Sequence, residues 1–130
     1  MPHPAPEAFV QAWVDAWNAH DVEGVLAHFH DDAAFSSPFA RMVFADSDGV
    51  FRGKPAIRRY WQTALAMIPD LKFVVQRFFV GVDTIVIEYR NHRGLIVNEV
   101  LIFDGDRVRQ GFGTYPPESI PAKQETAHGD

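Results

Sequence analysis

Residues 71–115 read LKFVVQRFFVGVDTIVIEYRNHRGLIVNEVLIFDGDRVRQGFGTY, a succession of β-branched and aromatic runs separated by short turns. The runs cover residues 71–80, 84–90, 95–103 and 108–115, and such residues favour strands. Because the connections between them are of hairpin length, consecutive strands are expected to pair with each other. This part of the chain therefore predicts an antiparallel meander.

Three helices are expected before this sheet. The first carries an apolar stripe from Phe9 to Trp17 at helical spacing, and Asp21 is a good N-cap for a second helix, whose apolar face includes Phe29. A third begins at Gly53-Lys54-Pro55, since proline suits the first turn of a helix, and Pro69 ends it. Helices on one side of an antiparallel sheet define an α+β fold.

The composition predicts one globular domain over residues 7–115, because 130 residues with 47% hydrophobic content can bury a single core. The proline-rich segments 1–6 and 116–130 are expected to be flexible. Twelve basic against seventeen acidic residues, without a dense basic run, argue against nucleic acid and against anionic membrane surfaces.

Cysteine is absent, which excludes disulfides, thiolate metal sites and a cysteine nucleophile, and fits a reducing compartment. The start of the chain has neither the charge nor the apolar run of a signal peptide, and no apolar run reaches membrane-spanning length. We therefore expect a cytoplasmic protein that does not associate with membranes.

Several local strings, in their order and spacing, resemble one known superfamily. They are AWNAHD at residues 16–21, FHDDA at 29–33, GKPAI at 53–57 and FDG at 103–105. The chain resembles the cone-shaped superfamily of nuclear transport factor 2 (NTF2), ketosteroid isomerase and the SnoaL-like polyketide cyclases. The resemblance implies three N-terminal helices packed on a strongly curved, mostly antiparallel sheet, which forms a cone with an internal pocket.

The same resemblance bears on individual residues. It places Trp13 where ketosteroid isomerase has its oxyanion-hole tyrosine, Ser37 where that enzyme has its aspartate base, and Glu99 where it has a protonated aspartate. Trp13 has no phenolic proton, and Ser37 cannot abstract a proton unaided. Steroid isomerisation by that mechanism is therefore not expected.

Glu99 is the candidate catalytic residue. Val97, Glu99, Leu101 and Phe103 share one strand face, which the resemblance places inside the cone. A carboxyl group there should have a raised pKa and could exchange a proton near neutrality. Alternatively, the opposite face points inward and Glu99 pairs with an arginine on the surface.

Nine further residues are candidates for contact with a ligand, because the resemblance and strand alternation place them around the same pocket. They are Trp13, Ser37, Tyr60, Ile85, Ile87, Tyr89, Leu101, Gly113 and Tyr115. Trp17 and Trp61 are expected to be ordinary core residues, since aromatic stripes at helical spacing usually pack. Ser37, next to a proline, also fits a turn that bonds its own backbone.

No metal and no cofactor are expected. His28 and His30, two apart on a helix, should point to different sides, so they are not a metal pair. The glycines form no nucleotide-binding fingerprint, and no serine lies in a Gly-x-Ser-x-Gly elbow.

Three functions remain open. The first is a protein that binds a small hydrophobic or aromatic compound in an apolar pocket, without proven catalysis. The second is an isomerase, cyclase or dehydratase that uses Glu99 as general acid or base on a polyketide-like or steroid-like carbonyl compound, with Trp13 or Tyr60 polarising an oxygen. The third is a protein-interaction module.

A homodimer is expected through the outer face of the sheet. Val74, Val86, Val100 and Phe112 alternate away from the expected pocket and would leave apolar area exposed on a monomer. The superfamily resemblance also implies a dimer.

Overall fold

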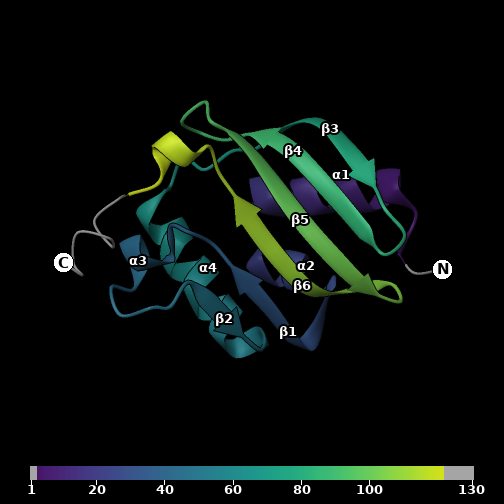
Figure 1. Cartoon of the computed structure of the whole chain (residues 1–130), viewed down its shortest axis with the longest axis horizontal. Helices are drawn as coiled ribbons and strands as arrows, with labels where there is room; N and C mark the ends of the chain where they lie inside the picture. Colours follow the sequence, from purple (N-terminus) through teal and green to yellow (C-terminus); the bar gives the residue numbers. More distant parts are fainter. Residues whose placement is uncertain (1–2, 122–130) are drawn as a thin grey trace.

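The computed structural model describes residues 3–121 and shows the expected α+β architecture, a curved six-stranded sheet with helices against its inner face (Figure 1). The helices are α1 (Pro6–Asn18), α2 (Val22–Leu26), α3 (Ala40–Val43), α4 (Lys54–Met67) and the 3-10 helix η1 (Pro117–Ser119). The strands are β1 (Phe29–Ser36), β2 (Val50–Arg52), β3 (Val74–Val80), β4 (Thr84–Arg90), β5 (Ile96–Asp104) and β6 (Arg107–Thr114). The fold class is confirmed, and α3 and η1 are additions to the three helices expected from the sequence.

The strands lie in the order β2-β1-β6-β5-β4-β3. From β3 to β6 each strand pairs antiparallel with the next, which is the predicted meander. The pairing of β1 with β6 is parallel and joins the first strand of the chain to the last. Register shifts interrupt three of the ladders, and bulges of this kind bend a sheet toward a cone.

The second helix is shorter than its apolar pattern indicated. Asp21 caps it as expected, since its carboxylate accepts a hydrogen bond from the Gly24 backbone N–H at 3.0 Å. The helix ends at Leu26, and Phe29 and His30 begin strand β1 instead of continuing the helix. Phe29 is fully buried and packs against Trp61 of α4. Its apolar side chain therefore continued the helical pattern of α2 in the sequence although it belongs to a strand.

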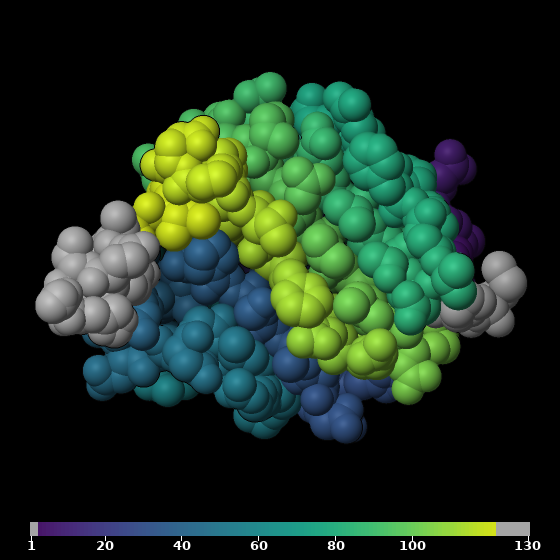
Figure 2. Space-filling view, viewed as in Figure 1, coloured from purple at the N-terminus to yellow at the C-terminus, as the bar shows by residue number. Residues whose placement is uncertain are grey.

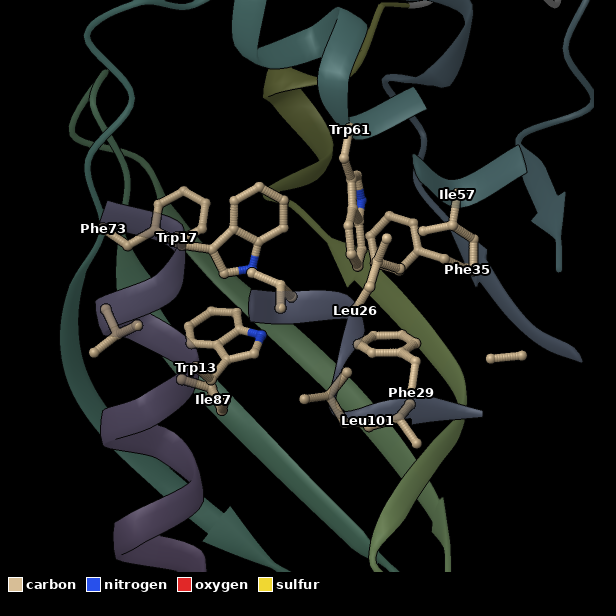
Figure 3. Packing of buried hydrophobic residues seen from close by; sticks show 14 of the residues in the cluster. Trp13, Trp17, Leu26, Phe29, Phe35, Ile57, Trp61, Phe73, Ile87 and Leu101 are labelled. Carbon is tan, nitrogen blue, oxygen red and sulfur yellow. The ribbon is translucent and has the colours of Figure 1, made fainter. Parts of the chain in front are cut away.

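An aromatic cluster joins the helices to the sheet (Figure 3). The Trp61 ring of α4 meets Trp17, Phe29 and Phe35 edge-on, with ring centroids 4.9 to 5.4 Å apart. Edge-to-face contacts add to the burial energy of aromatic rings. The cluster fixes α1 and α4 against the concave face of the sheet.

The turn after α1 clamps the segment that leads into β3. The Asn18 side chain donates to the Phe73 carbonyl at 3.0 Å and accepts from the Phe73 N–H at 2.8 Å. A ring nitrogen of His20 lies 3.0 Å from the Leu71 carbonyl oxygen. This explains the Asn and the His of the AWNAHD string, because their side chains fix the position of residues 71–73. Leu71 and Phe73 line the cavity described in the next subsection.

The described elements run from Pro6 to Ser119, slightly beyond the predicted domain 7–115. The flexibility expected of the termini stays a prediction, and positions 1–2 and 122–130 of those termini lie outside the described residues. Among residues 3–121 there is no helix with the length and apolar character needed to cross a bilayer.

Candidate functional site

A small cavity of about 90 Å³ lies between the concave face of the sheet, α1 and α4. Its polar lining comes from Glu99 on β5, Tyr89 on β4, Tyr60 on α4, and Ser37 and Tyr115, which follow β1 and β6. Apolar and aromatic side chains complete the wall: Trp17, Phe35, Trp61, Ala64, Leu65, Ile68, Leu71 and Phe73. Polar groups that converge in an apolar pocket are the usual mark of a ligand site.

Glu99 lies on the inner face of the sheet, the face that the superfamily resemblance placed inside the cone. Burial alternates along β5 so that Val97, Glu99, Leu101 and Phe103 are buried, which rules out the surface alternative for Glu99. Only 4% of the residue is exposed. The Tyr89 hydroxyl donates a long hydrogen bond of 3.4 Å to Glu99 Oε1.

Burial raises the pKa of Glu99 to about 8, and the hydrogen bond from Tyr89 opposes that shift only in part. No lysine, arginine or histidine of residues 3–121 lines the cavity to stabilise a carboxylate. The carboxyl group is therefore mostly protonated at neutral pH, with a minor ionised fraction.

The three tyrosines of the cavity remain neutral donors. Burial raises the pKa of Tyr60, Tyr89 and Tyr115, and the negative charge that Glu99 carries when ionised raises each of them further. The Ser37 hydroxyl offsets part of the shift at Tyr60 and Tyr115. The Tyr60 and Tyr115 hydroxyls thus share Ser37 as a polar neighbour, and both line the cavity as potential donors to a ligand oxygen.

Ser37 has both of the roles that the sequence suggested. Its hydroxyl oxygen accepts a hydrogen bond from the Phe39 N–H at 3.2 Å, which forms a local turn, and the same side chain lines the cavity. Gly113 lies beside the cavity as the partner of Glu99 across β5 and β6. A Cβ there would lie 3.6 Å from Tyr115 Cε1, an ordinary contact distance, so the position places the strand close to that ring without requiring glycine.

Five of the nine expected ligand contacts do not line the cavity: Gly113, described above, and the four residues that follow. Ile85, Ile87 and Leu101 are fully buried in the core below it, because their strand positions face the helices toward the narrow end of the cone. Trp13 is buried between Phe73, which it stacks on at 5.8 Å, and Tyr89 at 5.5 Å. Trp13 therefore supports two wall residues, and its indole does not reach the site.

Most of the apolar wall of the inner cavity was not predicted from the sequence. Trp17 and Trp61 are core residues as expected, but they also line the cavity. Helical spacing from Trp61 through Ala64, Leu65 and Ile68 was the available signal for the α4 wall. The indole nitrogen of Trp17 is buried without a hydrogen-bond partner in the described part of the chain.

His28 and His30 do point to different sides, but for a different reason than the one expected. His28 follows α2 and packs edge-on against Phe9 at 5.0 Å, where burial lowers its pKa. His30 belongs to β1, and its Nε2 lies 2.8 Å from the Asp104 carbonyl oxygen. Residues 3–121 contain no cluster of three metal-ligating side chains, and the expectation of no metal stays a prediction.

A second space, the outer cleft, opens beside the inner cavity. It measures about 260 Å³ and lies between α3, the end of α4 and the β4–β5 turn. Ala64, Ile68 and Tyr115 line both spaces, so the outer cleft adjoins the inner cavity. The three elements meet at one end of the molecule, on the left and upper left in Figure 1.

This combination of cone, helical cover and internal carboxyl group defines a protein class. A family model described as the SnoaL-like domain matches residues 10–115, and the chain belongs to this family of the NTF2-like superfamily. Among curated proteins, no significant match is found.

Solved structures agree with this assignment. A SnoaL-like protein of unknown function from Burkholderia thailandensis is 38% identical, with a TM-score of 0.79 over 85% of this chain and 94% of that one. TerC, crystallised with polyporic acid, is 14% identical, with a TM-score of 0.73 over 88% and 95%. A provisionally assigned polyketide cyclase from Sinorhizobium meliloti is 15% identical, with a TM-score of 0.66 over 82% and 94%. The last two likenesses concern the fold alone.

Proposed function

We propose that the protein binds a hydrophobic, carbonyl-bearing small molecule in the cone and that Glu99 exchanges a proton with it. The observation that carries the proposal is the buried Glu99 carboxyl group, which has a pKa near neutrality and shares a cavity with neutral tyrosine hydroxyls. A general acid or base works best when its pKa lies close to the working pH. That TerC, a neighbour in fold, was crystallised with polyporic acid supports a cone that holds ligands.

The chemistry that fits these groups is proton transfer next to a carbonyl. The ionised Glu99 removes a proton from the carbon beside the carbonyl, the C–H electron pair becomes a C=C bond, and the carbonyl electrons move to oxygen. A hydroxyl of Tyr60 or Tyr115 donates to that oxygen as negative charge develops on it. Protonated Glu99 then returns its proton to carbon, so the side chain ends as it began.

Deuterium uptake by a methyl ketone tests this proposal. Wild-type protein should accelerate exchange of the acetyl protons of 4-acetylbiphenyl in D2O, measured by mass spectrometry, and Glu99→Gln should reduce the acceleration by about 100-fold or more. The rate should rise with pH up to about 8 and then level off, because the carboxylate is the active form. Glu88→Gln, an outward-facing glutamate on the neighbouring strand, is the matched control.

A ligand that binds without exchange would favour the alternative, a binding protein without catalysis. Exchange that survives in Glu99→Gln would remove Glu99 from the mechanism. Failure to bind any ketone would contradict the proposal as a whole and return attention to an interaction module.

We also propose that the protein is a homodimer that assembles through the outer sheet face. Phe79, Val86, Val100 and Phe112 are cross-strand neighbours and form one apolar row over β3, β4, β5 and β6. Val74 and Phe79 are each more than half exposed. Figure 2 shows this face of the molecule, and none of the helices in residues 3–121 covers it. An uncovered apolar row on a sheet is typical of an interface.

Sedimentation velocity measures this assembly. Wild-type protein should sediment as a dimer at micromolar concentration, and Val100→Glu, in the centre of the row, should shift it to monomer, because each copy would bury an unpaired charge. Arg109→Glu, an exposed change on β6, should leave the dimer intact. A wild-type monomer at that concentration would contradict the proposal. The cytoplasmic location expected from the sequence remains a proposal as well.

A further inference from the structure

The inner cavity is too small to hold a whole ligand of the kind proposed above. Its volume is about 90 Å³. A benzene molecule occupies a cavity of about 150 Å³, and small-molecule pockets usually begin near 300 Å³. Only a carbonyl group and its immediate neighbours can reach Glu99, so the rest of the molecule has to extend elsewhere.

The outer cleft provides that space, with about three times the inner volume. One wall is apolar and carries two exposed methionines, Met42 at 58% and Met67 at 57%. Methionine side chains adapt to varied apolar shapes. This wall suits the hydrophobic body of an elongated molecule.

The opposite wall is the turn between β4 and β5. Asn91 Oδ1 accepts hydrogen bonds from the backbone N–H groups of Arg93 and Leu95 at 2.9 and 3.0 Å. Arg90 Nη1 donates to the Gly94 carbonyl at 2.9 Å, and Gly94 adopts a positive φ of 79°. The turn is braced from both sides, so the position of the Arg93 backbone at the cleft is fixed.

The charges of the two spaces contrast with those of the whole chain, which carries a net charge of −5. The outer cleft is lined by Arg93 and His92 and by no aspartate or glutamate of residues 3–121. Arg93 forms no ion pair with the described residues. Among the described residues, Glu99 is the only acid that lines the inner cavity, and it is mostly neutral at pH 7. The lining of the two adjoining spaces by residues 3–121 therefore carries one permanent charge, the positive charge of Arg93.

We propose that the ligand is an elongated, hydrophobic carboxylic acid whose carbonyl end enters the inner cavity and whose carboxylate pairs with Arg93 at the mouth of the outer cleft. This inference rests on the proposed function for the carbonyl end. The β5 strand gives a measure of length, because Leu95 at the cleft lies four residues from Glu99, or about 13 Å along the strand. A rigid biphenyl body suits that span.

Two matched probes separate the ends of the site. The acid probe is 4′-acetylbiphenyl-4-carboxylate, and the neutral probe is 4-acetylbiphenyl, which has the same ketone and body. Affinities are measured by tryptophan fluorescence at low and high salt. Wild-type protein should bind the acid probe about fivefold more tightly at low salt, because only the acid probe can form a charge pair with the exposed Arg93 guanidinium. The preference should shrink in high salt.

Arg93→Gln should abolish this preference and leave binding of the neutral probe unchanged. Arg107→Gln, an exposed arginine at the β5–β6 turn, is the control and should keep the preference. Equal affinity of both probes in wild type, or a preference that persists in Arg93→Gln, would contradict the proposal that Arg93 binds a carboxylate. It would not contradict the proposal that a ketone binds beside Glu99. Binding of neither probe would overturn both proposals.

Discussion

Wild-type protein should lose stability as the pH rises from about 4.5 to about 8, and Glu99→Gln should not. The folded state holds the Glu99 proton more tightly than the unfolded chain does, because its pKa is raised from 4.5 to about 8. Between these pH values the Glu99 carboxyl is ionised in the unfolded chain and still protonated in the folded protein. Raising the pH therefore favours the unfolded chain and lowers the free energy of unfolding. Above about pH 8 both states are ionised, and the loss levels off.

The size of this effect follows from the shift. One unit of pKa corresponds to about 1.4 kcal/mol, so the loss across the window is roughly 3–5 kcal/mol, a large part of the stability of an ordinary domain. Urea unfolding of wild type and Glu99→Gln at each half pH unit from 4 to 9 measures it. The difference between the two curves is the informative quantity, because it cancels the opposite contribution of His28, whose pKa is lowered.

Glu88→Gln provides the comparison for this experiment. Glu88 lies on the other face of the sheet, where its carboxylate is 3.5 Å from the exposed Arg77, and this partly exposed pair should contribute about 1 kcal/mol or less. Its curve should run parallel to wild type. Parallel curves for Glu99→Gln, together with an ordinary carboxyl titration of Glu99 by NMR, would mean that water reaches this group and that the proton-transfer proposal has lost its basis.

Ala64→Phe should abolish binding of 4-acetylbiphenyl, a loss of roughly 100-fold or more. Ala64 lines both the inner cavity and the outer cleft, so an added phenyl ring would lie where the two spaces adjoin. That ring alone is comparable in size to the inner cavity, which measures about 90 Å³. Calorimetry with the ketone measures the loss, and deuterium uptake should disappear with it.

The control for this prediction is Ala66→Phe on the same helix, which is exposed and lines neither space. It should bind like wild type. The pH dependence of stability should persist in Ala64→Phe, because Glu99 remains buried. If Ala64→Phe binds normally, the ligand does not pass between the two spaces as we propose.

The sequence predicted the sheet better than the site. Alternation along β5 put Glu99 on one face with Val97, Leu101 and Phe103, and the superfamily resemblance indicated that this face lies inside, as it does. Alternation cannot tell how deep in a tapering cone a residue lies. Ile87 and Tyr89 therefore looked equivalent, although Tyr89 reaches the cavity and Ile87 lies in the core below it.

The outer cleft could not be predicted from the sequence. It depends on the short α3 and on where the β4–β5 turn meets the end of α4, which are long-range contacts. His92 and Arg93 read as ordinary turn residues, and nothing in their spacing relates them to Met42 or Met67. The β1 boundary was also missed, since Phe29 satisfies a helical apolar stripe and a strand face equally well.

The parallel pairing of β1 with β6 bears on how the protein is made. Phe35 pairs with Phe51 of β2 on one side and with Gly111 of β6 on the other, so a growing chain on the ribosome lacks the second partner of β1 until β6 has emerged. Distant contacts of this kind slow folding, because a long loop must close before they form. Until then β1 has β2 and the helices as its neighbours. The pairing of Glu99 with Gly113 also has to wait for β6, so the wall of the inner cavity cannot be complete before that strand has emerged.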